Sequence, residues 1–248
     1  MARASDPPLQ AVTFDFWNTL IRADDGGVRD RRLAAWLGLL AGEGFDLERD
    51  VVGGAVRHAG ERFNENWRAN RIYGAPEAVT DMLDHLGIEA NPSLRDQLVS
   101  SIADPDPAHD PSPTPNVGQA LDALRDAGVR IGIICDVGLA PSSTLRRYLD
   151  RHGLLDRFDH WSFSDEVGCF KPDPAIFAHA RAGLGHPPAG AMAHVGDLRR
   201  TDVGGAQAAG WFAVRYTGIA DDHGSAKDGI EADAVIADHA DLPAALGL

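Results

Sequence analysis

Four charged residues in this sequence could meet in one reactive cluster, although they lie far apart along the chain: Asp15, Lys171, Asp197 and Asp202. Clustered carboxylates repel one another, so they need a compensating positive charge. Mg²⁺ is the usual solution, because it accepts one or two carboxylates together with substrate oxygens and waters. A lysine adds further positive charge, and helix N-termini attract anions. Together these groups suit the binding of a phosphate.

The lysine is unusual in this composition. Only two of the 23 basic residues are lysines, Lys171 and Lys227, and the others are arginines. Lysine carries a compact point charge on a slim stem, whereas arginine carries a broad planar fork. We therefore expect Lys171 to occupy a position that a guanidinium cannot fill.

Each of these residues also has a plain structural interpretation when taken alone. An aspartate after a strand often caps a turn or a helix, and this could apply to Asp136 and Asp202. Lys171 could be a solvated surface residue. The joint pattern is what favours a functional site.

The first part of the chain predicts one strand followed by helices. The strand is the short apolar run 11–17, which ends at the turn residues Asn18 and Thr19. The helices are expected at 31–40, 50–67, 77–86 and 93–103. Residues 104–115 contain five prolines and predict a linker.

After the linker, strands alternate with helices. The expected strands are 129–135, 160–163, 191–196, 211–216 and 234–237, and the expected helices are 116–127, 142–152, 174–182 and 202–209. This alternation predicts right-handed βαβ units and a parallel sheet. Ligands bind outside the carboxyl ends of such strands. Asp15, Asp136 and Asp197 each lie at or just past the end of a predicted strand.

The expected fold class is therefore α/β, with a Rossmann-like parallel sheet core that carries an inserted α-helical domain. We assign residues 1–22 and 114–248 to the core. Residues 23–113 form the helical insert, and its proline-rich end leads the chain back to the core.

The composition narrows the partners and the location. The formal net charge of −14 at pH 7 argues against nucleic acid and against anionic membranes. No apolar run reaches the roughly 18 residues of a membrane span, and the first ten residues lack the apolar region of a signal peptide. We expect a cytoplasmic protein with a small-molecule substrate, as a monomer or a homodimer. Its two cysteines, Cys135 and Cys169, imply no disulfide framework.

Four segments resemble the motifs of the haloacid dehalogenase superfamily, in order and in spacing. Residues 15–20 (DFWNTL) resemble the DxDxT loop, and Cys135 stands where the second motif has Ser or Thr. Residues 171–174 (KPDP) resemble the third motif, and residues 196–202 (GDLRRTD) the fourth, GDxxxTD. The resemblance covers nearly the whole chain and favours the phosphatase-like branch with a helical cap after the first motif.

The resemblance implies a role for each residue. Asp15 would attack phosphorus and form an aspartyl-phosphate. Mg²⁺ would be held by Asp15, the backbone carbonyl of Trp17 and Asp197, with Asp202 in support. Lys171 would orient Asp15 and offset charge on the phosphoryl group. The chain is thus expected to be a Mg²⁺-dependent hydrolase of a small phosphorylated metabolite.

Two positions depart from the family pattern. Phosphatases of the family usually carry an aspartate as general acid where this chain has Trp17, and an indole offers only a weak N–H donor. Loss of that acid should cost about 10²–10⁴-fold for poor leaving groups. His58 and Glu61 in the insert are candidate replacements. The Cys135 thiol is a weak donor, although backbone N–H groups including that of Asp136 could still bind an anion.

The sequence leaves two alternative functions open. The dehalogenase branch of the superfamily also lacks the second aspartate of the first motif, but it works without metal and its fourth motif is not GDxxxTD. A catalytically degenerate member could instead act as a binding or regulatory protein.

The insert offers its own candidates. Arg68 and Arg71 could contact an anionic substrate, and Trp67 or Tyr73 could stack on a ring. The alternative is a polar helix end whose two aromatic residues pack into the core of the insert. Leu33, Trp36, Leu37 and Leu40 recur at helical spacing and predict that core.

Overall fold

A computed structural model describes residues 7–22, 27–103, 110–222 and 229–248 of the chain. None of the helices within these ranges combines the length and apolar character that a bilayer crossing requires.

The chain forms two compact units. One unit comprises Met1–Ala23, Pro111–Asp136 and Leu149–Leu248, and the other comprises Asp24–Asp110 and Val137–Tyr148. Residues 137–148 follow the second strand of the sheet, yet they group with the insert. The boundaries expected at 22/23 and 113/114 stay a prediction.

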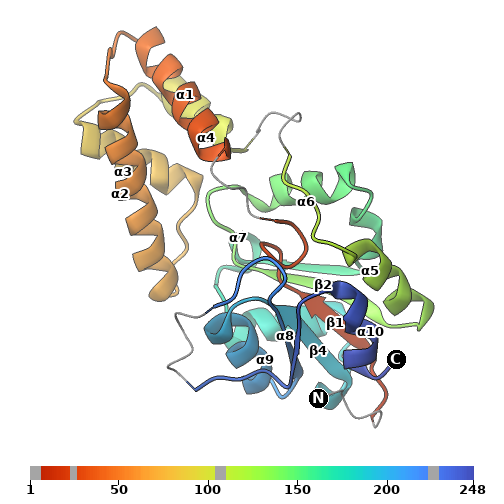
Figure 1. Cartoon of the computed structure of the whole chain (residues 1–248). Coiled ribbons are helices and arrows are strands. Elements are labelled where there is room, and N and C mark those ends of the chain that lie inside the picture. Colours follow the sequence, from red (N-terminus) through yellow and green to blue (C-terminus); the bar gives the residue numbers. More distant parts are fainter. Residues whose placement is uncertain (1–6, 23–26, 104–109, 223–228) are drawn as a thin grey trace. The chain divides into compact units, whose positions relative to one another are not determined.

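The first unit contains one six-stranded parallel sheet (Figure 1). Its strands are β1 (Ala11–Phe14), β2 (Arg130–Cys135), β3 (His160–Phe163), β4 (Met192–Gly196), β5 (Phe212–Tyr216) and β6 (Ala234–Ile236). Their order is β3-β2-β1-β4-β5-β6, and every neighbouring pair is parallel. The predicted α/β class is confirmed. The central strands β1 and β4 are buried along their whole length, as expected for a sheet covered on both faces.

The helices that accompany the sheet are short. They are α5 (Val117–Asp126), α7 (Ser164–Val167), α8 (Pro174–Gly183), α9 (Gly204–Ala208) and α10 (Leu242–Leu246). A further helix, α6 (Ser142–Arg151), begins among the residues that group with the insert and ends in the first unit. The start of α8 follows from its sequence, because Pro174 occupies the first turn and the Asp173 side chain accepts a hydrogen bond from the backbone N–H of Ala175 at 2.9 Å.

Two predicted elements end differently from the expectation. The first strand stops at Phe14 rather than at Trp17, because the backbone N–H groups of Leu20 and Ile21 both bond to the Phe16 carbonyl and close a tight loop. The expected helix 202–209 is instead a π-helical turn, Arg199–Val203, followed by α9. Such turns recur at functional sites.

The second unit contains four longer helices, which confirms the predicted helical insert. They are α1 (Gly27–Gly42), α2 (Arg49–Arg68), α3 (Ala75–Leu86) and α4 (Pro92–Ala103). Their shared core includes Leu33, Trp36 and Leu40, with Leu37 packed against it. The Trp36 indole is 1% exposed, and its N–H donates to Ser101 Oγ at 2.7 Å. Residues 104–109 of the predicted linker lie outside the described residues.

Replacing Trp36 with alanine should destabilise the insert by about 3–5 kcal/mol, because a large buried side chain is lost and a cavity remains. Val51→Ala is the matched control, since Val51 is 50% exposed, and it should change stability by no more than about 0.5 kcal/mol. Urea unfolding followed by circular dichroism measures both. Equal effects of the two substitutions would contradict the described core.

Candidate active site

Three loops meet at the carboxyl edge of the sheet. Asp15 follows β1, Asp136 follows β2 and Asp197 follows β4, and these three strands are neighbours. Loops after adjacent parallel strands lie side by side, and ligands bind at this edge in α/β sheets. The convergence expected from the sequence is thus present in the strand order.

Lys171 connects two of the acidic residues directly. Its Nζ donates to Asp15 Oδ1 at 2.5 Å and to Asp202 Oδ1 at 2.6 Å. The side chain is only 2% exposed, so these charge-assisted bonds operate away from water. The backbone N–H of Lys171 donates to Asp136 Oδ1 at 2.8 Å and holds the loop that carries the lysine. Lys171 is therefore not the solvated surface residue of the alternative interpretation.

Asp202 is fully engaged by the protein. Its Oδ1 also contacts His194 Nε2 at 3.0 Å, and its Oδ2 accepts the backbone N–H of Leu198 at 2.9 Å. Burial opposes ionisation, but Lys171 and His194 together hold the pKa of Asp202 below its ordinary value. Asp202 is therefore a carboxylate whose oxygens already have partners.

The remaining two carboxylates are less well compensated. Burial raises the pKa of Asp15 against the opposing charge of Lys171, and the charge of Asp202 raises it further. Burial also raises the pKa of Asp197, and the charges of Asp15 and Asp202 add to that effect. The Asn18 amide donates to Asp197 Oδ2 at 3.5 Å. Within the described residues, Lys171 is thus the one lysine whose positive charge compensates these three buried carboxylates. An additional cation would offset the excess negative charge.

The donor set suits a cation with few protein ligands. Within the described ranges, no group of three or more histidine, cysteine or acidic side chains is arranged to hold a metal ion. Mg²⁺ does not need such a group, since it keeps several waters and uses one or two carboxylates. Asp15 and Asp197 are chemically appropriate for that role, and the four-residue set that includes Trp17 and Asp202 stays a prediction.

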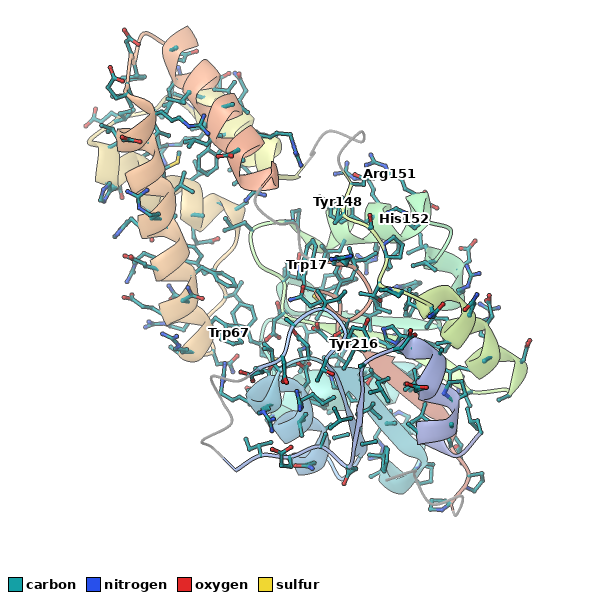
Figure 2. All side chains as sticks on the ribbon, in the orientation of Figure 1. Trp17, Trp67, Tyr148, Arg151, His152 and Tyr216 are labelled. Atoms are coloured by element: carbon teal, nitrogen blue, oxygen red, sulfur yellow. The ribbon has the colours of Figure 1, made fainter. Side chains whose placement is uncertain are left out.

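Trp17 lies in the loop after β1 (Figure 2). The loop turns at Asn18, whose φ of 56° is left-handed, and the Trp17 ring meets Phe16 edge-on at a centroid distance of 5.0 Å. An indole has no proton to exchange at neutral pH. Trp17 therefore cannot serve as a general acid in this loop.

Cys135 ends β2 with no exposed surface. Burial, followed by the charge of Asp15, raises the pKa of its thiol well above the ordinary value, so a thiolate nucleophile is disfavoured. The half-buried Asp136 uses its side chain to hold the backbone of Lys171. Anion binding by Cys135 or by Asp136 stays a prediction.

Candidates in the insert belong to the second compact unit. Arg68 and Arg71 are exposed, and their contact with a substrate stays a prediction. Tyr73 is buried and its hydroxyl donates to Asp81 Oδ2 at 3.0 Å, which favours a structural role over ring stacking. Trp67 is half-buried. His58 stacks on His85 with ring centroids 4.7 Å apart.

Sequence reasoning missed two polar residues inside the strands, Thr13 and His194. Both are buried, and Thr13 Oγ1 lies 2.8 Å from His194 Nδ1. The sequence did contain a sign of them, because each interrupts an otherwise apolar strand. It also did not mark Gly196 as a steric requirement: a Cβ at that position would lie 2.3 Å from Asp202 Cγ.

A second missed pair holds the loop that follows Asp15. The Thr19 carbonyl accepts from Thr114 Oγ1 at 2.7 Å and lies 2.8 Å from Nε2 of the buried His239. Tyr216, labelled in Figure 2, stacks on His239 with centroids 4.2 Å apart. His239 comes from near the end of the chain, so no local pattern could have linked it to this loop.

Comparisons with known proteins show what this chain is similar to. Residues 9–210 match the family model of haloacid dehalogenase-like hydrolases. A glyceraldehyde 3-phosphate phosphatase of Methanopyrus kandleri is 30% identical over 84% of this chain and 83% of its own. A (S)-2-haloacid dehalogenase 1 of a Pseudomonas species is 24% identical over 86% of both chains. The solved structure of a phosphatase from Thermococcus onnurineus superposes with a TM-score of 0.63 at 24% identity, covering 95% of this chain and 96% of that one.

The thiols offer a direct check on the described site. Ellman's reagent should leave Cys135 unmodified in the native protein, because the thiol is buried and its pKa is raised. Guanidinium chloride should then make it reactive. Cys169→Ser serves as the background, so that Cys135 is the single remaining thiol. Rapid modification of native Cys169→Ser protein would contradict the burial of Cys135.

Proposed function

Because the chain belongs to the family of haloacid dehalogenase-like hydrolases, we propose that this enzyme hydrolyses a small phosphorylated metabolite through an aspartyl-phosphate on Asp15. One observation carries the proposal: the Lys171 ammonium, buried from water, holds Asp15 and Asp202 together at the carboxyl edge of the sheet. A carboxylate placed in this way is available as a nucleophile, and the lysine offsets the charge of an incoming phosphoryl group.

The reaction has two balanced steps. The Asp15 carboxylate forms a bond to phosphorus while the bond between phosphorus and the leaving oxygen breaks. Water then attacks phosphorus while the bond between phosphorus and the Asp15 oxygen breaks. The protons of this water go to inorganic phosphate and to solvent, and the carboxylate is regenerated. Lys171 stays protonated throughout, since the neighbouring acids raise its pKa well above the ordinary value despite burial. It orients Asp15 in both steps.

Mg²⁺ is the cofactor that the donor set supports. Asp15, Asp197 and the backbone carbonyl of Trp17 would hold it, and it would supply positive charge beside the phosphoryl oxygens. We assign Asp202 to Lys171 rather than to the metal, because both of its oxygens already accept hydrogen bonds from the protein.

Because Trp17 cannot supply a proton, it limits which leaving groups the enzyme should displace. With no acid at this position, substrates whose leaving groups need no proton should react best, namely acyl and aryl phosphates. The relative named for glyceraldehyde 3-phosphate suggests that small sugar phosphates belong in the same test. An alkyl phosphate would require an acid from elsewhere, for which His58 and Glu61 remain the candidates.

A dehalogenase is the second candidate, favoured by Trp17 and by the 24% identical relative of that activity. The acidic pair Asp197 and Asp202 argues against it. Release of chloride from 2-chloropropionate in the presence of EDTA would establish the alternative. Mg²⁺-dependent binding of phosphorylated ligands without turnover would instead favour a regulatory protein.

The proposed function also implies a location and a class of partner. We propose a cytoplasmic protein whose partner is a small phosphorylated substrate, not nucleic acid or a membrane, as a monomer or a homodimer. The net charge of −14 supports the exclusion of nucleic acid.

A substrate panel tests the activity. We expect hydrolysis of acetyl phosphate or p-nitrophenyl phosphate with Mg²⁺, and its loss in EDTA. Asp15→Asn should lower kcat by on the order of 10³-fold or more, because it removes the nucleophile. Asp122→Asn is the control, since Asp122 is an exposed carboxylate on α5 that bonds to Arg157. Activity that survives EDTA or Asp15→Asn would overturn the proposal.

Restoring an acid tests the role of Trp17. Trp17→Asp should speed hydrolysis of alkyl phosphates by about 10²-fold or more, with a much smaller gain for aryl and acyl phosphates. Trp17→Asn is the matched control, because it changes the size of the side chain similarly without supplying a proton. Equal effects of Trp17→Asp on all three substrate classes, in a folded variant, would refute this account.

A further inference from the structure

The polar network around Lys171 continues past Asp202 into the sheet, and we propose that His194, held by Thr13, is a positioning residue that aligns Asp202 and Lys171 on Asp15. The proposal deepens the function proposed above and rests on it for its kinetic part. It concerns two residues that none of the four sequence motifs contains.

Thr13 and His194 face one another because of the strand register. Thr13 on β1 and His194 on β4 are paired residues of neighbouring parallel strands, so their side chains lie on the same face of the sheet. Both are at most 1% exposed. Thr13 Oγ1 lies 2.8 Å from His194 Nδ1, and His194 Nε2 lies 3.0 Å from Asp202 Oδ1. The same Asp202 oxygen accepts from Lys171.

The hydrogen-bond partners of His194 determine which of its two ring nitrogens carries the hydrogen. An ionised Asp202 can only accept, so His194 Nε2 must be the donor toward it. In the neutral ring, Nδ1 is then an acceptor, and the Thr13 hydroxyl can donate to it at 2.8 Å rather than to the Ala193 carbonyl, which lies 3.4 Å from Oγ1. The opposite tautomer would direct a nitrogen lone pair at a carboxylate. Asp202 thus fixes the tautomer, and the Thr13 hydroxyl holds the ring at Nδ1 in that tautomer.

The surroundings leave the ring and the carboxylate little freedom. The Phe177 ring meets His194 edge-on at a centroid distance of 5.7 Å. The Leu198 N–H anchors the other oxygen of Asp202, and Gly196 leaves space that any Cβ would fill. Hydrogen bonds therefore run without interruption from the interior of the sheet to the nucleophile: Thr13, His194, Asp202, Lys171 and Asp15.

This series of hydrogen bonds predicts a kinetic effect of His194, although His194 cannot touch substrate. Without a donor from His194, Asp202 loses one of the bonds that locate it, and the Lys171 ammonium shifts relative to Asp15. Misplacement of a catalytic group lowers the rate of the chemical step far more than it weakens substrate binding. We therefore expect kcat to fall while KM stays within about 2-fold.

Thr13→Val is the most direct test, because it keeps the shape of the side chain and removes only the hydroxyl. We expect kcat to fall by about 10-fold. Ser162→Ala is the matched control. Ser162 is also a buried hydroxyl in the sheet, on β3, and its Oγ lies 2.8 Å from His179 Nδ1. The control should keep kcat within about 2-fold. Equal kcat for wild type and Thr13→Val would overturn the proposal.

A double-mutant cycle separates positioning from general destabilisation. His194→Phe removes the donor and should lower kcat at least as much as Thr13→Val, whereas His194→Gln keeps a donor at the reach of Nε2 and should recover part of the rate. Because Thr13 acts only through His194, adding Thr13→Val to His194→Phe should cost nothing further. Fully additive losses would overturn the proposal. If His194→Phe does not fold, His194→Gln replaces it in the cycle.

The tautomer can be measured without turnover. Nitrogen-15 NMR of wild-type protein should show His194 with its hydrogen on Nε2, and Thr13→Val should shift the Nδ1 resonance, because the hydrogen bond to that nitrogen is lost. A hydrogen on Nδ1 in the wild type would overturn the proposal. If no phosphate ester is hydrolysed at all, the proposed function fails separately, and the affinity for orthovanadate with Mg²⁺ becomes the readout: unchanged affinity in Thr13→Val would then overturn the positioning role.

Discussion

The buried ammonium of Lys171 between Asp15 and Asp202 is the interaction on which the site depends. Removing an ammonium and two carboxylates from water is costly, and the cost is recovered only when each charge has close partners. Here Lys171 Nζ has two carboxylate oxygens within 2.6 Å, and Asp202 has further donors. Removing one member would leave a buried charge without compensation. One lysine nitrogen donates to both carboxylates, an arrangement that arginine's planar fork would not reproduce, and this accounts for a lysine in an arginine-rich chain.

The sheet brings these charges together with little help from the helices. β1 lies between β2 and β4, so the loops that carry Asp15, Asp136 and Asp197 leave the same edge. The loop that carries Lys171 is held by Asp136, whose side chain accepts the Lys171 N–H. Burial, together with the charges of neighbouring carboxylates, raises the pKa of Asp15 and of Asp197, and a divalent cation beside them would favour their ionised forms.

Much of this site could be predicted from the sequence, because the key residues follow recognisable strands. Asp15 and Lys171 were expected to meet, and they do. The support of a metal by Asp202 stays a prediction, but the sequence did not show that this side chain accepts the Leu198 N–H or that it lies in a π-helical turn. That outcome depends on side-chain geometry, which periodicity does not report. Thr13 and His194 were missed because their contact joins residues 181 positions apart.

In the insert, the helices could be predicted from the sequence, but the tertiary grouping could not. Its four helices and its Trp36 core follow from apolar spacing, but the grouping of residues 137–148 with it is a matter of tertiary contacts that no local pattern encodes. The substrate-binding roles of Arg68 and Arg71 remain predictions for the same reason. Two arginines in the sequence indicate an anion contact but do not show where the anion would bind.

The central claim is that Asp15 carries the phosphoryl group. Wild-type protein mixed with Mg²⁺ and acetyl phosphate can be quenched rapidly in acid and treated with borohydride, which reduces an acyl phosphate to an alcohol. Peptide mass spectrometry should then find homoserine at position 15, and Asp15→Asn protein should show none. Turnover with no reduced aspartate at position 15, or with the modification on another residue, would contradict the account.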